Sequence, residues 1–358
     1  MTTLAPTWAP SVFGIVGGKP QTRECWEPRQ RLLETMGIAP ASVPALVEAH
    51  HYSAAILAQV RDTLATLASA CRENRVTFFV LGSVGRFEAS QQSDLDLAVV
   101  TEGAPDLPAA LHLRAQAIKL LRAEGFDIPE KTFDRLVPLA ALTQIGGRHD
   151  SNDNLTYRAL LLTEGVCVAG PESGQKVFEA LLTAYCRGPI TSGRYFTALS
   201  NDLHRYYRTV CLDYRHKVEV GKHWATRSLK LKHSRRLWHL ANLATWCDIS
   251  TVADSEREAA LTRQLGEPPL WRLIRALHAL GGGDVGREII HTFDTFLGHF
   301  ARPEIRAELE SLAYPEREAC PTYRHLYANA SALEAGAMAV FEFMWTRCRD
   351  HMFRFSVL

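Results

Sequence analysis

The spacing of apolar residues changes twice between positions 53 and 100. Residues 53–72 repeat apolar side chains at steps of three and four, which places these side chains on one face of a helix. Residues 75–80 (RVTFFV) are β-branched and aromatic, and they predict a strand. Residues 94–100 (DLDLAVV) alternate charged and apolar positions before becoming fully apolar, and they predict a second strand.

Another helix and a short extended segment follow in the same region. Residues 108–124 have helical spacing and are followed by Gly125, a residue type that commonly ends helices. Residues 125–128 are apolar on both sides of Asp127, so they could form a third strand or its edge. The order helix, strand, turn, strand, helix, strand predicts an α/β (α+β) domain with a small mixed sheet.

The strand pattern fades beyond about residue 170. Helical spacing continues in four segments, residues 176–186, 195–214, 225–247 and 333–350. We therefore expect a partly irregular N-terminal extension over residues 1–45, an α/β catalytic domain over residues 46–172 and an all-helical C-terminal domain over residues 173–358.

Composition excludes several protein classes. The 358 residues include 40 basic and 39 acidic side chains, so the near-zero net charge argues against nucleic-acid binding by the whole surface. No apolar run approaches the roughly 20 residues of a membrane-spanning helix, and no membrane partner is expected. The eight cysteines are dispersed and form no C-x-x-C pair, which predicts reduced thiols and favours a cytoplasmic location.

Residues 81–100 (LGSVGRFEASQQSDLDLAVV) contain the strongest candidate chemistry. Gly82 and Ser83 follow a predicted strand, where backbone N–H groups can approach an anion closely and the serine adds a hydroxyl donor. Asp94 and Asp96 are one residue apart on the next predicted strand, so their carboxylates point to the same side. Two such carboxylates repel each other unless a cation lies between them, and Mg²⁺ (or Mn²⁺) is the natural candidate.

A turn that holds phosphate beside a paired-carboxylate metal site is the minimum equipment for nucleotidyl transfer. A Gly-Ser turn by itself is common in proteins of every kind, and so is a lone D-x-D pair. The two motifs in this order, each next to an apolar strand, are far more specific than either one alone. We therefore interpret residues 81–100 as the core of a catalytic site.

The pattern G-S-x-G-R-x-E followed by S-D-x-D-L resembles the signature of the polymerase-β-like nucleotidyltransferase superfamily. Within it, the chain is similar to the branch that contains the bacterial nitrogen-regulator uridylyltransferase and related nucleotidyltransferases. Residues 153–170 resemble the helix and strand that follow the catalytic core in that branch. Residues 221–227 (GKHWATR) resemble a segment that opens a helix against the active site. The resemblance covers roughly residues 76–246.

The resemblance implies roles for the residues of both motifs. Asp94 and Asp96 would bind Mg²⁺, while Gly82 and Ser83 would hold the β- and γ-phosphates of a nucleoside triphosphate such as ATP. Arg86 would either lie near the phosphates or pair with a glutamate, Glu88, to brace the loop. Ser93 would orient Asp94 rather than contact the substrate.

The superfamily also implies a third carboxylate from a later strand, which helps to hold the metal and can act as general base on the acceptor hydroxyl. Asp127 fits this role best, because it lies between two apolar residues on a possible strand that follows a helix. Glu130 and Asp134 compete with it. We therefore include Asp127 with Asp94 and Asp96 as catalytic and metal-binding residues.

Residues 215–236 (RHKVEVGKHWATRSLKLKHSRR) are dense in basic residues. On a helix, one polar stripe is formed by His223, Arg227, Lys230 and Ser234. A stripe of this kind is most often a solvated helix face, and that interpretation stays open.

Two functional interpretations of the basic stripe compete with the solvated face. In the first, Arg227, Lys230 and Lys222 reach across the cleft and bind the triphosphate. In the second, the stripe holds an RNA backbone, and Trp224 or Tyr206 offers a stacking surface.

The expected function is Mg²⁺-dependent transfer of a nucleoside monophosphate from a nucleoside triphosphate to an acceptor hydroxyl, with release of pyrophosphate. The acceptor could be a protein, a tRNA or a small molecule, and the active site is expected between the two domains. Two alternatives remain: a catalytically silent NTP-binding sensor, and the nucleotidyltransferase half of a toxin–antitoxin or defence system.

Overall fold

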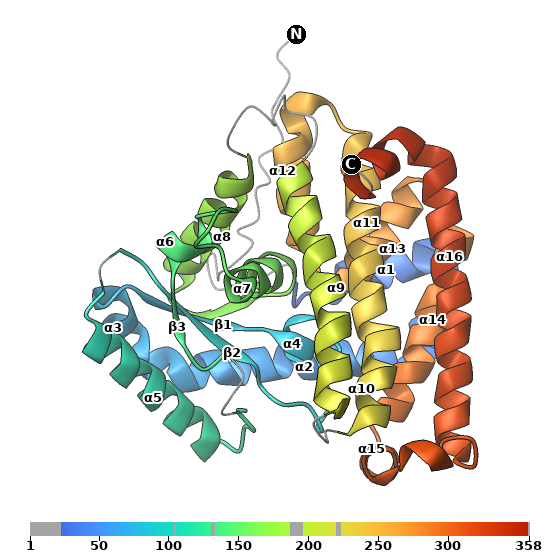
Figure 1. Cartoon of the computed structure of the whole chain (residues 1–358), viewed down its shortest axis with the longest axis horizontal. Coiled ribbons are helices and arrows are strands. Elements are labelled where there is room, and N and C mark those ends of the chain that lie inside the picture. Colours follow the sequence, from blue (N-terminus) through green and yellow to red (C-terminus); the bar gives the residue numbers. More distant parts are fainter. Residues whose placement is uncertain (1–22, 104, 130–132, 187–195, 220–222, 357–358) are drawn as a thin grey trace.

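The computed structural model of the chain (Figure 1) describes residues 23–103, 105–129, 133–186, 196–219 and 223–356. Its strands lie in the first half of the sequence: β1 (Val76–Val80), β2 (Leu97–Thr101), β3 (Leu136–Pro138) and β4 (Val166–Ala169). They form one sheet in the order β3-β2-β1-β4, with β1 antiparallel to both neighbours and β3 parallel to β2. The expected small mixed sheet is confirmed.

One expected strand was placed wrongly. Residues 125–128 form no strand, and the third strand along the chain is Leu136–Pro138. Gly125 has φ +90° and turns the chain out of the preceding helix. The backbone then reaches the sheet region through one hydrogen bond, in which the Asp127 carbonyl accepts the N–H of Leu95. Ile128 is buried in the core below the sheet, which explains its apolar character without a strand.

The first half also contains helices and helical turns, some of which cover the sheet. They are α1 (Glu27–Thr35), η1 (Pro40–Ser42), α2 (Pro44–Leu64), η2 (Ala65–Leu67), α3 (Ala68–Glu73), α4 (Gly82–Gly85), α5 (Leu107–Ala123), α6 (Leu139–Leu142), α7 (Asn152–Thr163) and α8 (Pro171–Cys186). Every residue of β1 and β2 is buried, because alternate side chains of these strands enter two different cores. Phe78 packs in the core with α2 and α5, whereas Phe79 packs in the core with α7 and α8.

The second half of the described chain is helical, as expected. It contains α9 (Thr197–Glu219), α10 (Trp224–Lys230), η4 (Leu231–Arg235), α11 (Arg236–Ser250), η5 (Asp254–Glu256), α12 (Arg257–Leu265), α13 (Pro269–Ala279), α14 (Gly283–Phe300), α15 (Pro303–Ser311), η6 (Tyr314–Glu316) and α16 (Pro321–Ser356). The helix expected over residues 225–247 is interrupted by η4, which is a π-helical turn. A π-helical turn inserts one extra residue into a helix and is frequent at functional sites.

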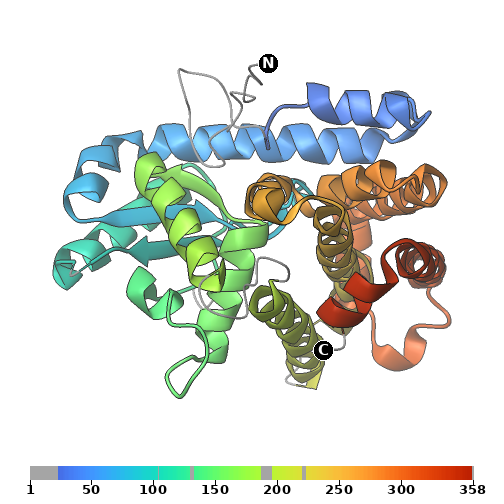
Figure 2. The same cartoon turned by 90° about the horizontal axis from the view of Figure 1, so that it is seen from above.

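Helix α2 connects the two halves of the molecule (Figure 2). Near its start, Leu46 and Ala49 belong to the core of the C-terminal helices. Toward its end, Leu57 and Val60 belong to the core below the sheet. A single rigid helix therefore spans both sides of the space in which the candidate site lies.

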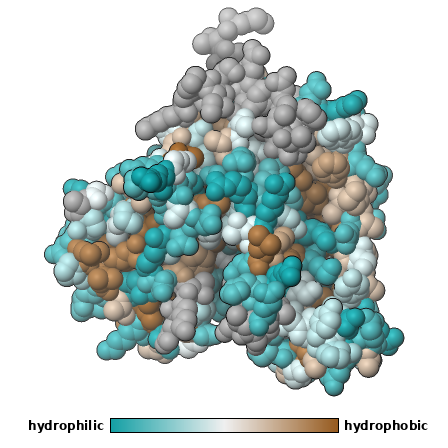
Figure 3. All heavy atoms as spheres, viewed as in Figure 1, coloured by the Kyte–Doolittle hydropathy of each residue, from teal (hydrophilic) through white to brown (hydrophobic). Residues whose placement is uncertain are grey.

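The molecular surface is predominantly hydrophilic on the face shown in Figure 3, where apolar side chains form separate small patches. The described part of the chain contains no helix with the length and apolar character needed to cross a membrane.

Candidate active site

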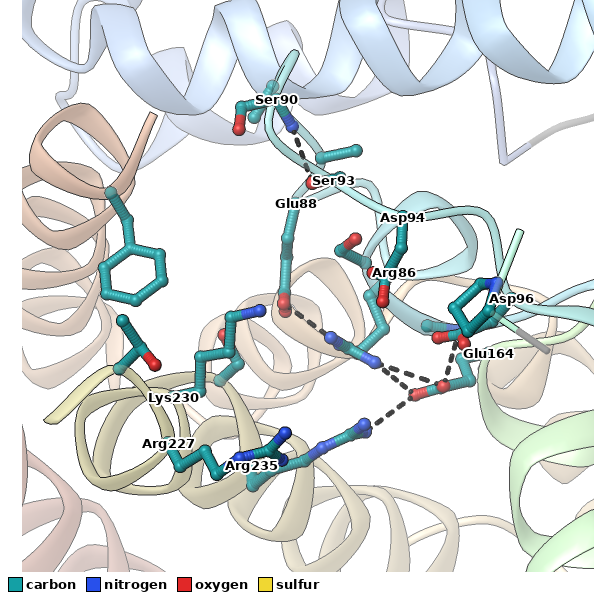
Figure 4. Close-up of a pocket in the computed structure, with 18 of the residues that line it drawn as sticks. Arg86, Glu88, Ser90, Ser93, Asp94, Asp96, Glu164, Arg227, Lys230 and Arg235 are labelled. Carbon is teal, nitrogen blue, oxygen red and sulfur yellow. Dashed lines mark hydrogen bonds and ion pairs between the residues drawn. The ribbon is translucent and has the colours of Figure 1, made fainter. Parts of the chain in front are cut away.

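A cavity of about 1580 Å³ lies between one end of the sheet and the C-terminal helices. Gly82, Ser83, Asp94 and Asp96 line it from the sheet side. Arg227 and other residues of the basic segment line it from the helical side. Figure 4 shows Asp94 and Asp96 on one side of this space and Arg227 on the other.

The close approach of Gly82 and Asp96 explains why a glycine follows β1. Gly82 has φ +68°, a left-handed conformation that glycine adopts without strain. A Cβ atom at this position would overlap Oδ2 of Asp96. The missing side chain therefore allows a carboxylate to lie directly against the backbone of the turn.

Asp94 and Asp96 lie in an extended segment immediately before β2. Leu95 between them is buried, so the two carboxylates project to the other side, toward the cavity. Burial and, next, the nearby Asp94 carboxylate raise the pKa of Asp96 to about 7. A divalent cation between the carboxylates would remove this repulsion, so the pair fits a metal such as Mg²⁺, which commonly takes one or two carboxylates and completes its shell with water and phosphate.

The expected third carboxylate does not join this pair. Asp127 is exposed and is not among the residues that line the cavity, because its segment lies outside the sheet. Asp134, just before β3, is also exposed but does line the cavity. Glu130 lies outside the described residues. Among the described residues, no group of three or more histidine, cysteine, aspartate or glutamate side chains could hold a metal.

A buried carboxylate that the sequence analysis did not identify supports the glycine turn. Glu164 follows α7 and is 0% exposed. Its Oε1 accepts the backbone N–H of Gly82 at 2.9 Å, and its Oε2 lies 3.0 Å from Nη1 of Arg86 and 3.5 Å from Nη1 of Arg235 (Figure 4). The Nε of Arg86 also donates to Glu88 at 2.9 Å. Of the two roles left open for Arg86, the structure forms the bracing ion pair.

The sequence offered only a weak signal for this network. Glu164 is the one acidic residue in the otherwise apolar run over residues 159–169. Arg235 lies at the end of the π-helical turn η4, so its direction does not follow from regular helical spacing. The Oγ of Ser93 accepts the backbone N–H of Ser90 at 3.1 Å, which closes the turn before Asp94.

The polar stripe of the basic segment faces the cavity. All four of its predicted members line the cavity wall: His223, Arg227, Lys230 and Ser234. The Nε of Arg227 is buried and has no hydrogen-bond partner in the described structure. Burial and the nearby Arg306 guanidinium lower the pKa of Lys230. Lys222 lies outside the described residues.

Neither candidate stacking residue offers an open ring. Tyr206 is only 4% exposed. Trp224 donates its indole N–H to the Leu312 carbonyl at 2.7 Å, and its ring lies 4.9 Å from that of Tyr314 and 5.0 Å from that of Tyr323. Because both rings are already packed, a base could not stack on them without a rearrangement.

Comparisons with known proteins bear on the sheet side of this site. A search of curated proteins gave no match. A family model, Putative nucleotidyltransferase DUF294, matches residues 30–132. This segment includes β1, the turn at Gly82 and Ser83, and both aspartates of the pair. The match supports the nucleotidyltransferase superfamily for this segment and does not distinguish a branch within it.

Proposed function

We propose that this protein transfers a nucleoside monophosphate from a nucleoside triphosphate to an acceptor hydroxyl and releases pyrophosphate. The observation that carries the proposal is the carboxylate pair of Asp94 and Asp96. Asp96 lies against Gly82, and the pair faces Arg227 and Lys230 across one cavity. The family match supports nucleotidyl transfer in general. Dependence on Mg²⁺, the choice of ATP or another triphosphate and the identity of the acceptor are finer parts of the proposal.

Asp94 and Asp96 would hold Mg²⁺ (or Mn²⁺) between their carboxylates. When bound, the ion neutralises phosphate charge and stabilises the leaving pyrophosphate. Ser83 contributes a hydroxyl donor on the same side of the cavity. Asp127 has no place in this arrangement, because its exposed side chain lies away from the cavity lining.

The helical side would supply positive charge to the triphosphate. Arg227 and Lys230 make no ion pair with a carboxylate in the described structure, so their charges are available to an anionic ligand. Lys222, outside the described residues, would assist from the start of the same segment. Arg86 is committed to Glu164 and Glu88, and it would act by fixing the glycine turn.

The acceptor remains a choice among a protein, a tRNA and a small molecule. A protein acceptor is favoured by the resemblance to the uridylyltransferase branch, which modifies a protein. A cytoplasmic location belongs to the same proposal and rests on the dispersed, unpaired cysteines. A silent NTP sensor, or the nucleotidyltransferase half of a toxin–antitoxin or defence pair, would use the same donor site.

Radiolabel transfer tests the proposal directly. The protein is incubated with Mg²⁺, total cell protein and RNA, and each of the four triphosphates labelled with ³²P at the α-phosphate. We expect one class of acceptor to gain label, and the double variant Asp94→Asn, Asp96→Asn to lower the rate by at least about a thousandfold while it still unfolds in one cooperative thermal transition. Full activity of the double variant would refute the proposal, and tight NTP binding without pyrophosphate release would favour the sensor.

A further inference from the structure

Two basic side chains share one aromatic ring on the helical wall of the cavity. The Nζ of Lys230 and the guanidinium carbon of Arg306 each lie 5.8 Å from the ring centroid of Phe300, the last residue of α14. All three residues line the cavity. In the part of the chain that the structure describes, neither cation makes an ion pair with a carboxylate.

Arg306 also connects the helical side to the aspartate segment. Its Nη1 donates a hydrogen bond to the carbonyl of Gln92. Gln92 belongs to the turn closed by Ser90 and Ser93, in which each serine accepts a backbone N–H of the other. This turn leads directly into Asp94. The position of Arg306 is therefore coupled through the backbone to one of the carboxylates of the site.

The positive charges of Lys230 and Arg306 have no anion in ion-pair contact to neutralise them in the described structure. Lys230 and Arg306 lie against the same Phe300 ring, and the Asp94 carboxylate is also close enough to influence the charge of Lys230. Two cations that are half-buried near each other repel, and burial makes their charges costly unless an anion accepts hydrogen bonds from them. A phosphate group provides such oxygens and favours arginine, which can bind it through two N–H groups.

We propose that Lys230 and Arg306 form the subsite for the terminal phosphate of the nucleoside triphosphate. This inference rests on the proposed function, and it adds Arg306 as a ligand-binding residue that no sequence motif indicated. Both cations line the cavity that the carboxylate pair also lines, and Arg306 contacts the turn that leads into Asp94, so one phosphate chain can reach the pair and the Phe300 wall. A phosphate carried by the acceptor has the same chemistry, so the experiment must separate the two sources.

Isothermal titration calorimetry with Mg²⁺ provides this separation. The probes are inorganic tripolyphosphate and the triphosphate, diphosphate and monophosphate of the nucleoside that the wild-type protein binds. We expect Arg306→Met and Lys230→Met each to weaken binding of tripolyphosphate and the triphosphate about tenfold, and to leave monophosphate binding within about twofold. Arg306→Lys keeps the charge and is expected to lose less affinity than Arg306→Met.

The matched control is Arg324→Met. Arg324 is exposed on α16 and is not among the residues that line the cavity, so its substitution is expected to change no affinity. Unchanged triphosphate affinity in both Arg306 variants would overturn the inference, as would an equal loss for monophosphate and triphosphate. Retained triphosphate affinity with lost label transfer would assign the subsite to the acceptor and also overturn it. If the wild-type protein bound neither tripolyphosphate nor any triphosphate, the proposed function itself would fail.

Discussion

The carboxylates of the site occupy two opposite electrostatic environments. Glu164 is fully buried, but it accepts hydrogen bonds from the backbone of Gly82 and from the guanidinium groups of Arg86 and Arg235. Asp94 and Asp96 face the cavity with no arginine or lysine within ion-pair distance in the described structure. One carboxylate is neutralised by the protein itself, whereas the other two leave negative charge for a ligand to neutralise.

This difference indicates a structural role for Glu164 and a ligand-binding role for Asp94 and Asp96. A buried charge that is fully paired fixes the geometry around it, because moving it would leave other charges uncompensated. Two neighbouring carboxylates without a cationic partner destabilise the folded protein unless a cation binds between them. Glu164 and Asp96 both contact Gly82, so the supporting network holds the turn against which Asp96 lies.

Replacing Glu164 should have the largest effect on stability. Glu164→Gln keeps the shape of the side chain but leaves Arg86 and Arg235 with one buried carboxylate fewer. We expect the free energy of unfolding to fall by about 3–5 kcal/mol, as measured by urea denaturation. Asp94→Asn is the matched control and should not lower it. A loss below about 1 kcal/mol for Glu164→Gln would show that the network does not hold the turn.

The same comparison explains which parts of the site the sequence could reveal. The glycine turn and the D-x-D pair are local motifs, so residue type and spacing were enough to identify them. Glu164 and Arg235 acquire their role only when α7 and η4 pack together, and no local pattern encodes that contact. Arg306 was missed for the same reason, since its partners Phe300 and Gln92 lie in separate elements.

The fold was predictable to a similar degree. Apolar periodicity placed β1 and α5 to within one residue at each end, whereas α2 and α16 begin well before the predicted helices and the helices over residues 257–311 were not predicted. Asp127 was assigned to a strand because its apolar neighbours resemble one. In the described structure, however, Ile128 is apolar because it packs in the core, and the backbone of Asp127 bonds to Leu95, just before β2, without forming a strand. The π-helical turn η4 was not predicted, because the helix over residues 225–247 was inferred from regular helical spacing, which contains no inserted residue.

Lowering the pH should destabilise the folded protein through His233, a buried side chain that is neutral in the folded state. Burial lowers the pKa of His233 to about 4, although its Nδ1 lies 2.8 Å from the Leu229 carbonyl and its Nε2 lies 2.8 Å from the Asn329 side chain. Below about pH 6.5, His233 binds a proton in the unfolded chain but stays neutral in the folded protein. The free energy of unfolding should therefore fall by up to about 1.4 kcal/mol per pH unit between about pH 6.5 and 4.

The variant His233→Gln isolates this contribution from those of other buried histidines. His50 and His239 also have pKa values lowered to about 3 by burial, so they add slopes of the same sign. Urea denaturation of wild type and variant at a series of pH values should show a shallower acid slope in the variant, by about 1.4 kcal/mol per unit. Identical slopes would mean that His233 is protonated in the folded protein.

The smallest expected effect comes from relieving the repulsion between the unpaired carboxylates. Asp96→Asn removes one of two like charges and leaves a side chain of nearly equal size beside Gly82. Without divalent cations, we expect the variant to be more stable than wild type by about 1 kcal/mol in urea denaturation, the opposite sign to Glu164→Gln.

Added Mg²⁺ should then stabilise the wild type, by about 1.4 kcal/mol when the ion is at about ten times its Kd, and leave the variant unchanged. If Mg²⁺ stabilised both proteins equally, the ion would bind elsewhere. If Asp96→Asn lost stability instead, the carboxylate would have a partner in the folded protein, and the distinction between the two acidic environments would not hold.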